Sequence, residues 1–107
     1  MDKEMMKGSI DLLLMSLIVQ RDLYGYEMIQ ILKKLSDDTY EMSEGTLYAA
    51  LKRLERKEWV ESYWHVTESG RRKYYHITDE GKKELESKQE NWKWMDTLVR
   101  KSSEGLT

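Results

Sequence analysis

The sequence predicts a mainly α-helical fold with one small β-hairpin, namely a winged helix-turn-helix followed by a long C-terminal helix. Three observations predict this class. Residues 43–55 form an amphipathic segment with an apolar back and a basic front. Two strand-like segments then flank a turn that ends in Arg71-Arg72-Lys73. An uninterrupted helical pattern follows Thr78. We therefore expect a DNA-binding domain at residues 1–78 and a dimerisation helix at residues 79–107.

Composition limits the chain to one small domain. Its 107 residues bury only a modest share of their surface, so we expect a partner to add stability. The absence of cysteine excludes disulfides, a thiolate nucleophile and a cysteine zinc site. The charged N-terminus and the lack of a long apolar run predict a cytoplasmic protein with no membrane partner.

Charge is unevenly distributed along the chain. The net charge is -2, which taken alone argues against a nucleic-acid partner. However, residues 43–76 carry seven Lys or Arg and five Asp or Glu, so this part is positive and the remainder is negative. The positive part is also the part that resembles a DNA-reading unit.

The first two predicted helices supply most of the core. Residues 5–20 carry an apolar stripe at helical spacing, and a second apolar side is formed by Met5, Leu12 and Met15. Asp22 is the predicted N-cap of the second helix. The core side chains expected from this second helix are Tyr24, Met28, Ile31, Leu32 and Leu35.

The third predicted helix has the pattern of a major-groove reader. Ser43 is its expected N-cap, and Glu44 lies in the first turn, where the helix dipole favours an anion. One face is apolar and the other is small and basic, with Tyr48 and Arg53 on the flanks. When this segment is considered alone, an ordinary amphipathic helix with a solvated charged face fits it better than a DNA reader does. The apolar face comprises Leu47, Ala50, Leu51 and Leu54, and the opposite face Gly45, Ala49, Lys52 and Arg56.

The predicted hairpin strengthens the DNA-binding interpretation. Trp59 to Val66 and Arg71 to Ile77 are rich in aromatic and β-branched residues, and the segment between them has turn composition. Basic side chains at the turn suit contacts with DNA phosphates or a minor groove. The residues expected to contact double-stranded DNA are Ser43, Glu44, Thr46, Tyr48, Lys52, Arg53, Arg71, Arg72 and Lys73.

Four motifs in this order resemble the PadR family of bacterial transcriptional regulators. They are Tyr24-Gly25-Tyr26-Glu27, the segment from Gly45 to Glu55, the segment from Gly70 to Tyr75, and Thr78-Asp79-Glu80-Gly81. The resemblance implies a homodimeric winged-helix repressor of palindromic operators, in its compact form with one C-terminal helix. Two residues depart from the family pattern: Ala49 replaces a common proline, and Glu58 replaces a glycine before the first wing strand.

The C-terminal helix indicates a homodimer independently of the resemblance. Thr78 is its predicted N-cap, and apolar residues recur at heptad spacing along residues 79–102. One helix has no second layer to cover such a stripe, so we expect it to pack on the first helix of another subunit. The expected interface comprises Met5, Leu12, Met15, Leu85, Trp92, Met95 and Val99.

The resemblance also implies a ligand site. Multidrug-sensing members of the compact PadR group sandwich planar aromatic compounds between tryptophans at the dimer centre, and Trp92 is similar to that tryptophan. Asp96 and Asp11 are expected to favour a cationic ligand. The expected ligand-binding residues are Met5, Gly8, Asp11, Leu12, Trp92 and Asp96.

Other functions remain open at this point. Trp92 alone is equally consistent with simple interface packing, in which case the regulator would answer to phenolic acids or another signal without a central pocket. A winged helix that binds only proteins is a further alternative. Enzyme activity, cofactors and metals are not expected, because His65 and His76 offer only a weak cross-strand metal site with Glu61 or Glu68.

Overall fold

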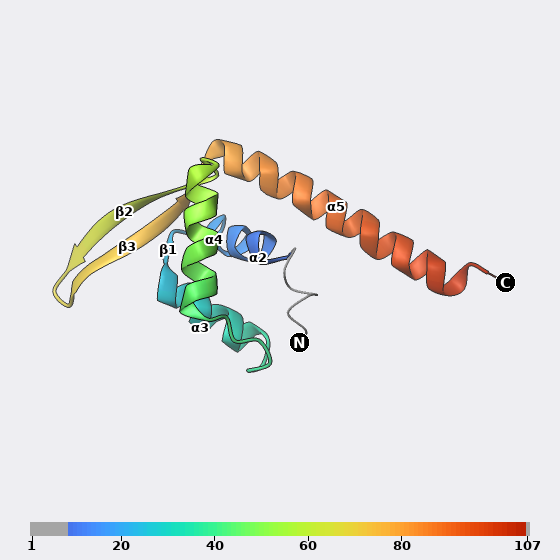
Figure 1. Cartoon of the computed structure of the whole chain (residues 1–107), viewed down its shortest axis with the longest axis horizontal. Helices are drawn as coiled ribbons and strands as arrows, with labels where there is room; N and C mark the ends of the chain where they lie inside the picture. The colour runs from blue at the N-terminus through green and yellow to red at the C-terminus, as the bar shows by residue number, and fades with distance from the viewer. Residues whose placement is uncertain (1–8, 107) are drawn as a thin grey trace.

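The computed structural model describes residues 9–106 and confirms the predicted fold class (Figure 1). The helices α2 (Ile10–Ile18), α3 (Gly25–Leu35) and α4 (Glu44–Arg56) precede a β-hairpin, and α5 (Asp79–Glu104) follows it. The hairpin and α5 project from opposite sides of α4, so the molecule is a helical body with two extensions (Figure 1). Met5 and Gly8, expected at the interface and ligand site, lie outside the described residues.

The sheet has three antiparallel strands, one more than the sequence predicts. It consists of β1 (Leu23–Tyr24), β2 (Val60–Thr67) and β3 (Gly70–Ile77) in the order β1-β3-β2. The two residues of β1 are too few to show an alternating pattern. Because β1 occupies the start of the expected helix, Tyr24 is the N-cap of α3, and the prediction of Asp22 at that position is wrong.

The core lies between the three short helices, the base of the sheet and the start of α5. The apolar face predicted for α4 is confirmed, since Leu47, Ala50, Leu51 and Leu54 are all buried. In α3, Met28 and Leu32 are buried, whereas Leu35 is 71% exposed at the last helical residue.

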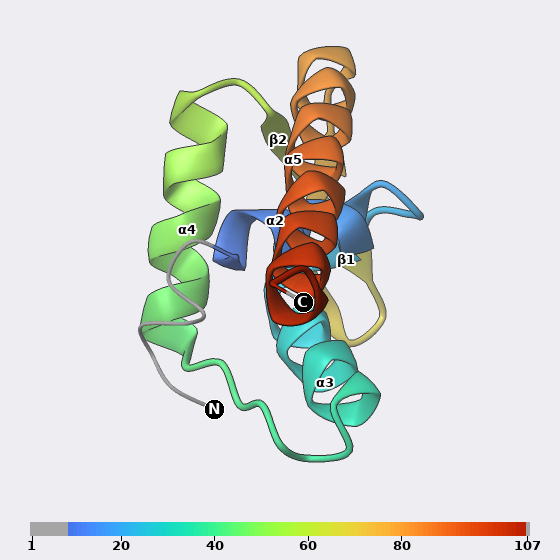
Figure 2. The same ribbon diagram turned by 90° about the vertical axis from the view of Figure 1, so that its right-hand side faces the viewer.

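Met15, expected in the dimer interface, lies in the core of the protomer. Its side chain is 0% exposed within the protomer and cannot face a second subunit. The reason is the position of α2, which contacts both α4 and α5 and is covered on more than one side (Figure 2). Leu12 is partly buried and packs against the same core.

The end of α4 turns sharply into the wing. Glu58 adopts a φ of 62°, in the left-handed region that favours glycine. The turn is closed by backbone hydrogen bonds from Glu58 to Glu55 (2.9 Å) and from Trp59 to Leu54 (3.1 Å). The glutamate at the position of the family's usual glycine therefore does not prevent the turn, although a non-glycine residue in this conformation costs about 1–2 kcal/mol.

Thr78 joins the wing, the end of α4 and the start of α5. Its hydroxyl accepts the N–H of Gly81 (2.9 Å), as predicted for the N-cap, and donates to the carbonyl of Glu58 (2.7 Å). Its own N–H donates to the carbonyl of Trp59 (3.0 Å). Gly81 lies so close to Trp59 that the first turn of α5 is fixed against this joint.

The two halves of α5 have different surroundings. Leu85 is 4% exposed in the protomer core, so its predicted place in the dimer interface is wrong. It is buried because the first turns of α5 pack on α2 and the Trp59 segment. Beyond residue 90 the helix leaves the body, and the radius of gyration is 15.9 Å, against about 13 Å for a compact chain of this length.

Candidate nucleic-acid interface

The solvent-facing side of α4 matches the predicted reading face. Gly45, Ala49, Lys52 and Arg56 are exposed, opposite the buried leucines. At the N-terminus, Ser43 Oγ accepts the N–H of Thr46 (3.1 Å) and donates to its hydroxyl (3.0 Å), which confirms the cap. Ser43, Glu44 and Thr46 remain exposed there. The front of α4 thus combines small residues, which permit close approach, with basic side chains.

Tyr48 extends from α4 onto the start of α3. Its side chain is 46% exposed, and its ring lies over Gly25. A Cβ atom on Gly25 would stand 2.8 Å from the Tyr48 hydroxyl, closer than van der Waals contact permits. The glycine of the Tyr24-Gly25-Tyr26-Glu27 motif therefore leaves the space that this phenol occupies.

Arg53 and Asp11, expected at two separate sites, form an ion pair with each other. The guanidinium of Arg53 on α4 donates to the Asp11 carboxylate on α2. Asp11 is therefore neutralised within the protomer and is not a free acid for a cationic ligand. The side chain of Arg53 is still partly exposed, but one of its N–H donors is bound to Asp11 on α2 and does not face the solvent side of α4.

The three basic residues of the wing do not share a face. Side chains alternate along a strand, so Arg71 and Lys73 lie on one side of the sheet and Arg72 on the other. The charged group of each lies over an aromatic ring, and the distances run from that group to the ring centroid. Arg71 lies 4.5 Å from Trp64, and Arg72 lies 4.5 Å from Tyr24. Lys73 lies 5.8 Å from Tyr75. Ser62 and Tyr75 share the α4-facing side with Lys73, since Ser62 bonds Glu55 on α4 and Tyr75 is buried.

A polar cluster stabilises the outer face of the sheet. Asp22 accepts a hydrogen bond from the Tyr63 hydroxyl (2.7 Å), and its other oxygen lies 2.8 Å from His76 Nδ1. Partial burial would raise the pKa of Asp22, but hydrogen bonds from Tyr63 and His76 and the charge of His76 lower it overall. The hydrogen bond to Asp22, aided by burial, raises the pKa of Tyr63 to about 12.

The weak metal site considered for the two histidines does not form. His76 pairs in register with Glu61, and His65 pairs with Arg72, so the two imidazoles are not cross-strand partners. Among residues 9–106, no group of three or more His, Asp or Glu side chains has the arrangement of a metal site.

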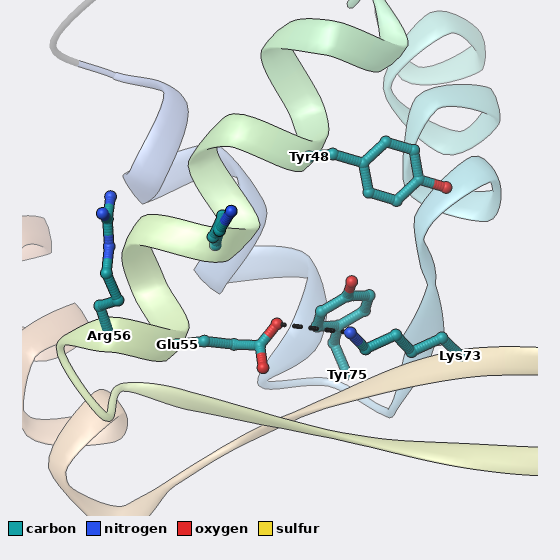
Figure 3. A pocket seen from close by; sticks show the side chains of 6 residues that line it. Tyr48, Glu55, Arg56, Lys73 and Tyr75 are labelled. Atoms are coloured by element: carbon teal, nitrogen blue, oxygen red, sulfur yellow. Dashed lines mark ion pairs between the residues drawn. The ribbon is translucent and has the colours of Figure 1, made fainter.

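A cleft of about 490 Å³ separates α4 from the wing (Figure 3). Its rim carries Lys52, Arg56 and Lys73, which are all basic. It also includes Glu55 and Tyr75, which sequence analysis did not select as site residues. Their proximity depends on how the wing folds back toward α4, and no local pattern in the sequence reveals that contact.

The far half of α5 presents an apolar stripe that no other element among residues 9–106 covers. Trp92 is 58% exposed, and Met95 and Val99 are also exposed, as the heptad spacing predicts. Trp94 and Leu98 extend the exposed apolar surface. Asp96, expected to attract a cationic ligand, forms an ion pair with Arg100 (3.1 Å) one turn later. In the part of the chain that the structure describes, no helix is both long and apolar enough to cross a bilayer.

Helix α4, the turn before it and the adjoining basic hairpin define the class of the protein: a winged-helix DNA-binding regulator. Comparison with known proteins makes the assignment specific. Residues 13–87 match the model of the transcriptional regulator PadR-like family, and the chain belongs to that family.

Solved structures agree with this assignment. A transcriptional regulator from Clostridium thermocellum has 35% identity and a TM-score of 0.86, with 94% of this chain and 96% of that chain covered. A PadR-like regulator from Bacillus cereus has 33% identity and a TM-score of 0.84, with 96% and 99% covered. A Lysinibacillus sphaericus relative called "Uncharacterized protein X" is 36% identical over 104 residues, covering 96% of this chain and 95% of its own.

Proposed function

We propose that the protein is a homodimeric repressor that binds a palindromic DNA operator. The observation that carries this proposal is the pairing of a basic helix face on α4 with a basic wing across one cleft. In this arrangement α4 enters the major groove, and Arg71 and Lys73 reach the adjacent backbone or minor groove. Arg72 contributes from the other side of the wing. The proposed activity is binding without catalysis, without a cofactor, and in the cytoplasm.

The far half of α5 supports the dimer. A lone protomer leaves Trp92, Met95 and Val99 in water, whereas a second copy provides a matching apolar surface. Two operator half-sites are read on one DNA face when the two α4 helices lie about 34 Å apart, one turn of the duplex. The dimer-forming part is therefore the second half of α5, with residues 1–78 as the DNA-binding domain.

We further propose that a planar aromatic ligand binds beside Trp92 and its symmetry mate and releases the repressor from DNA. The exposed indole supports this proposal. A ligand changes DNA affinity only if it prefers one dimer shape over the other. Asp96 contributes to the site in partnership with Arg100. Leu12, which is only partly buried against the protomer core, is the α2 residue proposed to line it.

The ion pairs favour a second possibility for the signal. Arg53 neutralises Asp11 and Arg100 neutralises Asp96, so neither acid has a strong need for a cationic ligand. A regulator that answers to phenolic acids, or to another signal without a central pocket, is the alternative that these pairs support. The two possibilities share the DNA-binding activity and differ only in the inducer.

A DNA titration tests the main proposal. Fluorescence anisotropy with a duplex from upstream of the protein's own gene should show binding that weakens steeply with salt. Arg71→Ala should reduce the slope of log K against log salt by about 0.9, because it removes one phosphate contact. Salt-independent binding, or none, would contradict the proposal and favour a protein-binding module.

A fluorescence titration tests the inducer. A planar cationic dye should quench tryptophan emission and weaken operator binding in the wild type and in Trp94→Ala. In Trp92→Ala both effects should be lost. If the dye has no effect on the wild type while a phenolic acid releases the DNA, the regulator has no central drug site.

A further inference from the structure

Glu55 is an acidic residue in a cleft whose other charged groups are basic. The cleft is lined by Tyr48, Lys52, Glu55, Arg56, Lys73 and Tyr75. Figure 3 shows Glu55 and Lys73 directed toward each other across the space between α4 and β3, with Tyr75 beside them. A carboxylate at this place is unfavourable for a surface that must approach phosphates, so its presence requires a physical explanation.

The carboxylate of Glu55 is held in place by both wing strands. The Ser62 hydroxyl on β2 donates to Glu55 Oε2 (3.0 Å), and Lys73 Nζ on β3 lies 4.0 Å from Oε1. The side chain of Glu55 is 33% exposed and that of Lys73 is 41% exposed. A separation of 4.0 Å is too long for a hydrogen bond, so the Lys73 contact is a weak ion pair that another anion can replace.

The neighbouring side chain of Tyr75 is also affected by the negative charge of Glu55. Burial, together with the negative charge of Glu55, raises the pKa of Tyr75 to about 12. Lys73 also lies 5.8 Å from the centroid of the Tyr75 ring, which limits the positions its ammonium group can take. Lys73 is therefore kept at the mouth of the cleft between one anion and one aromatic face.

We propose that Glu55 is a positioning residue that holds Lys73 in the cleft when DNA is absent and thereby limits DNA affinity. This inference rests on the proposed DNA-binding function. When a backbone phosphate reaches the cleft, Lys73 exchanges Glu55 for the phosphate, and the carboxylate of Glu55 is left to water. The ion pair weakens DNA binding because Lys73 must first separate from Glu55. The free energy of that separation offsets part of the attraction between Lys73 and the phosphate.

The test is the salt dependence of DNA binding by Glu55→Gln, measured by anisotropy with the upstream duplex. The amide oxygen of Gln still accepts from Ser62, but its charge is gone. We expect Glu55→Gln to bind about fivefold more tightly at low salt, as loss of a surface ion pair permits. The salt slope should steepen by up to about 0.9, the value of one phosphate contact, because Lys73 is then free to neutralise a phosphate in every complex.

Two comparisons separate this role from a general charge effect. Glu61→Gln removes the same charge from β2 at a residue paired with His76 and should change the slope much less. In a Lys73→Met background, Glu55→Gln should no longer steepen the slope, since there is no ammonium group to release.

The outcomes distinguish this inference from the proposed function. Wild-type protein without salt-dependent DNA binding would overturn the proposed function. Wild-type binding with unchanged affinity and slope in Glu55→Gln would overturn the role of Glu55 alone. A steeper slope that persists with Lys73→Met would also overturn it, because Glu55 would then repel phosphate directly. Thermal unfolding of each variant checks that the wing is still folded.

Discussion

At the scale of single residues, Gly25 is important because its missing side chain leaves room for the ring of Tyr48. The Tyr48 ring occupies the space that a side chain at Gly25 would need. A surface phenol on a helix would otherwise choose among several rotamers. The absence of a Cβ atom on α3 therefore gives α4 a defined aromatic group beside its basic face.

Gly25→Ala should displace Tyr48 and weaken operator binding by about tenfold, the equivalent of one lost contact of about 1.4 kcal/mol. Stability should change little, because the displaced ring is half exposed. Anisotropy titration measures the effect. In a Tyr48→Ala background the same substitution should have no further effect on affinity; a full additive loss would show that Gly25 acts by another route.

Asp22 makes the free energy of unfolding depend on pH in the acidic range. Because its pKa in the folded protein is below its ordinary value of 3.8, the unfolded state binds the proton more tightly. Its contribution to stability is therefore complete above about pH 4 and is lost as the pH falls through the folded-state pKa. Urea unfolding between pH 2 and pH 6 should show a smaller acid loss in Asp22→Asn than in the wild type. Equal losses would mean that Tyr63 and His76 do not stabilise the carboxylate.

At the scale of secondary-structure elements, the contact between α5 and the Trp59 segment joins the body to the far half of α5. A Cβ atom on Gly81 would stand 2.0 Å from the Trp59 carbonyl oxygen and 2.8 Å from Ile77. Neither neighbour is the mobile end of a long side chain. The start of α5 therefore cannot accept a larger residue without moving away from the sheet.

Gly81→Ala should lower the free energy of unfolding by about 1–3 kcal/mol, the usual cost of overpacking. Urea denaturation followed by circular dichroism measures it. Gly45→Ala is the matched control, because a Cβ atom there has open space and alanine favours a helix. Similar destabilisation by both variants would exclude a steric origin at Gly81.

The elements also show which features sequence alone can predict. Local signals identified both caps, Ser43 and Thr78, and the buried leucines of α4, because caps and helical periodicity depend on neighbours in the chain. The Arg53–Asp11 pair spans 42 residues, and no local pattern reveals such a contact. The separation of Arg71 from Arg72 was predictable from strand alternation. The burial of Met15 was not, because it depends on α5 returning to cover α2.

At the scale of the whole molecule, the protomer is elongated, with extents of 63 × 31 × 20 Å. The far half of α5 accounts for this shape and carries the uncovered apolar stripe (Figure 1). Among the described residues, the body thus has its own buried core, whereas the apolar side chains at the end of α5 are exposed.

Val99→Glu should therefore weaken the dimer while leaving the protomer folded. A charge buried at the interface lacks a partner, and the dimer dissociation constant should rise by at least about tenfold. Sedimentation velocity and circular dichroism together measure both effects. Thr97→Glu adds the same charge at an exposed residue off the stripe and should leave the dimer intact. A wild type that sediments as a monomer at micromolar concentration would contradict the proposed assembly.

The joint at Thr78 has a mechanical consequence for two connected copies. Helix α5 has 26 residues, which correspond to a length of about 39 Å. A rotation of about 10° at the joint would therefore move its far end by about 7 Å relative to α4. Since Thr78 also bonds the residues between α4 and the wing, in the proposed dimer a modest tilt of one subunit against the other would be amplified into a mismatch with the pitch of the duplex.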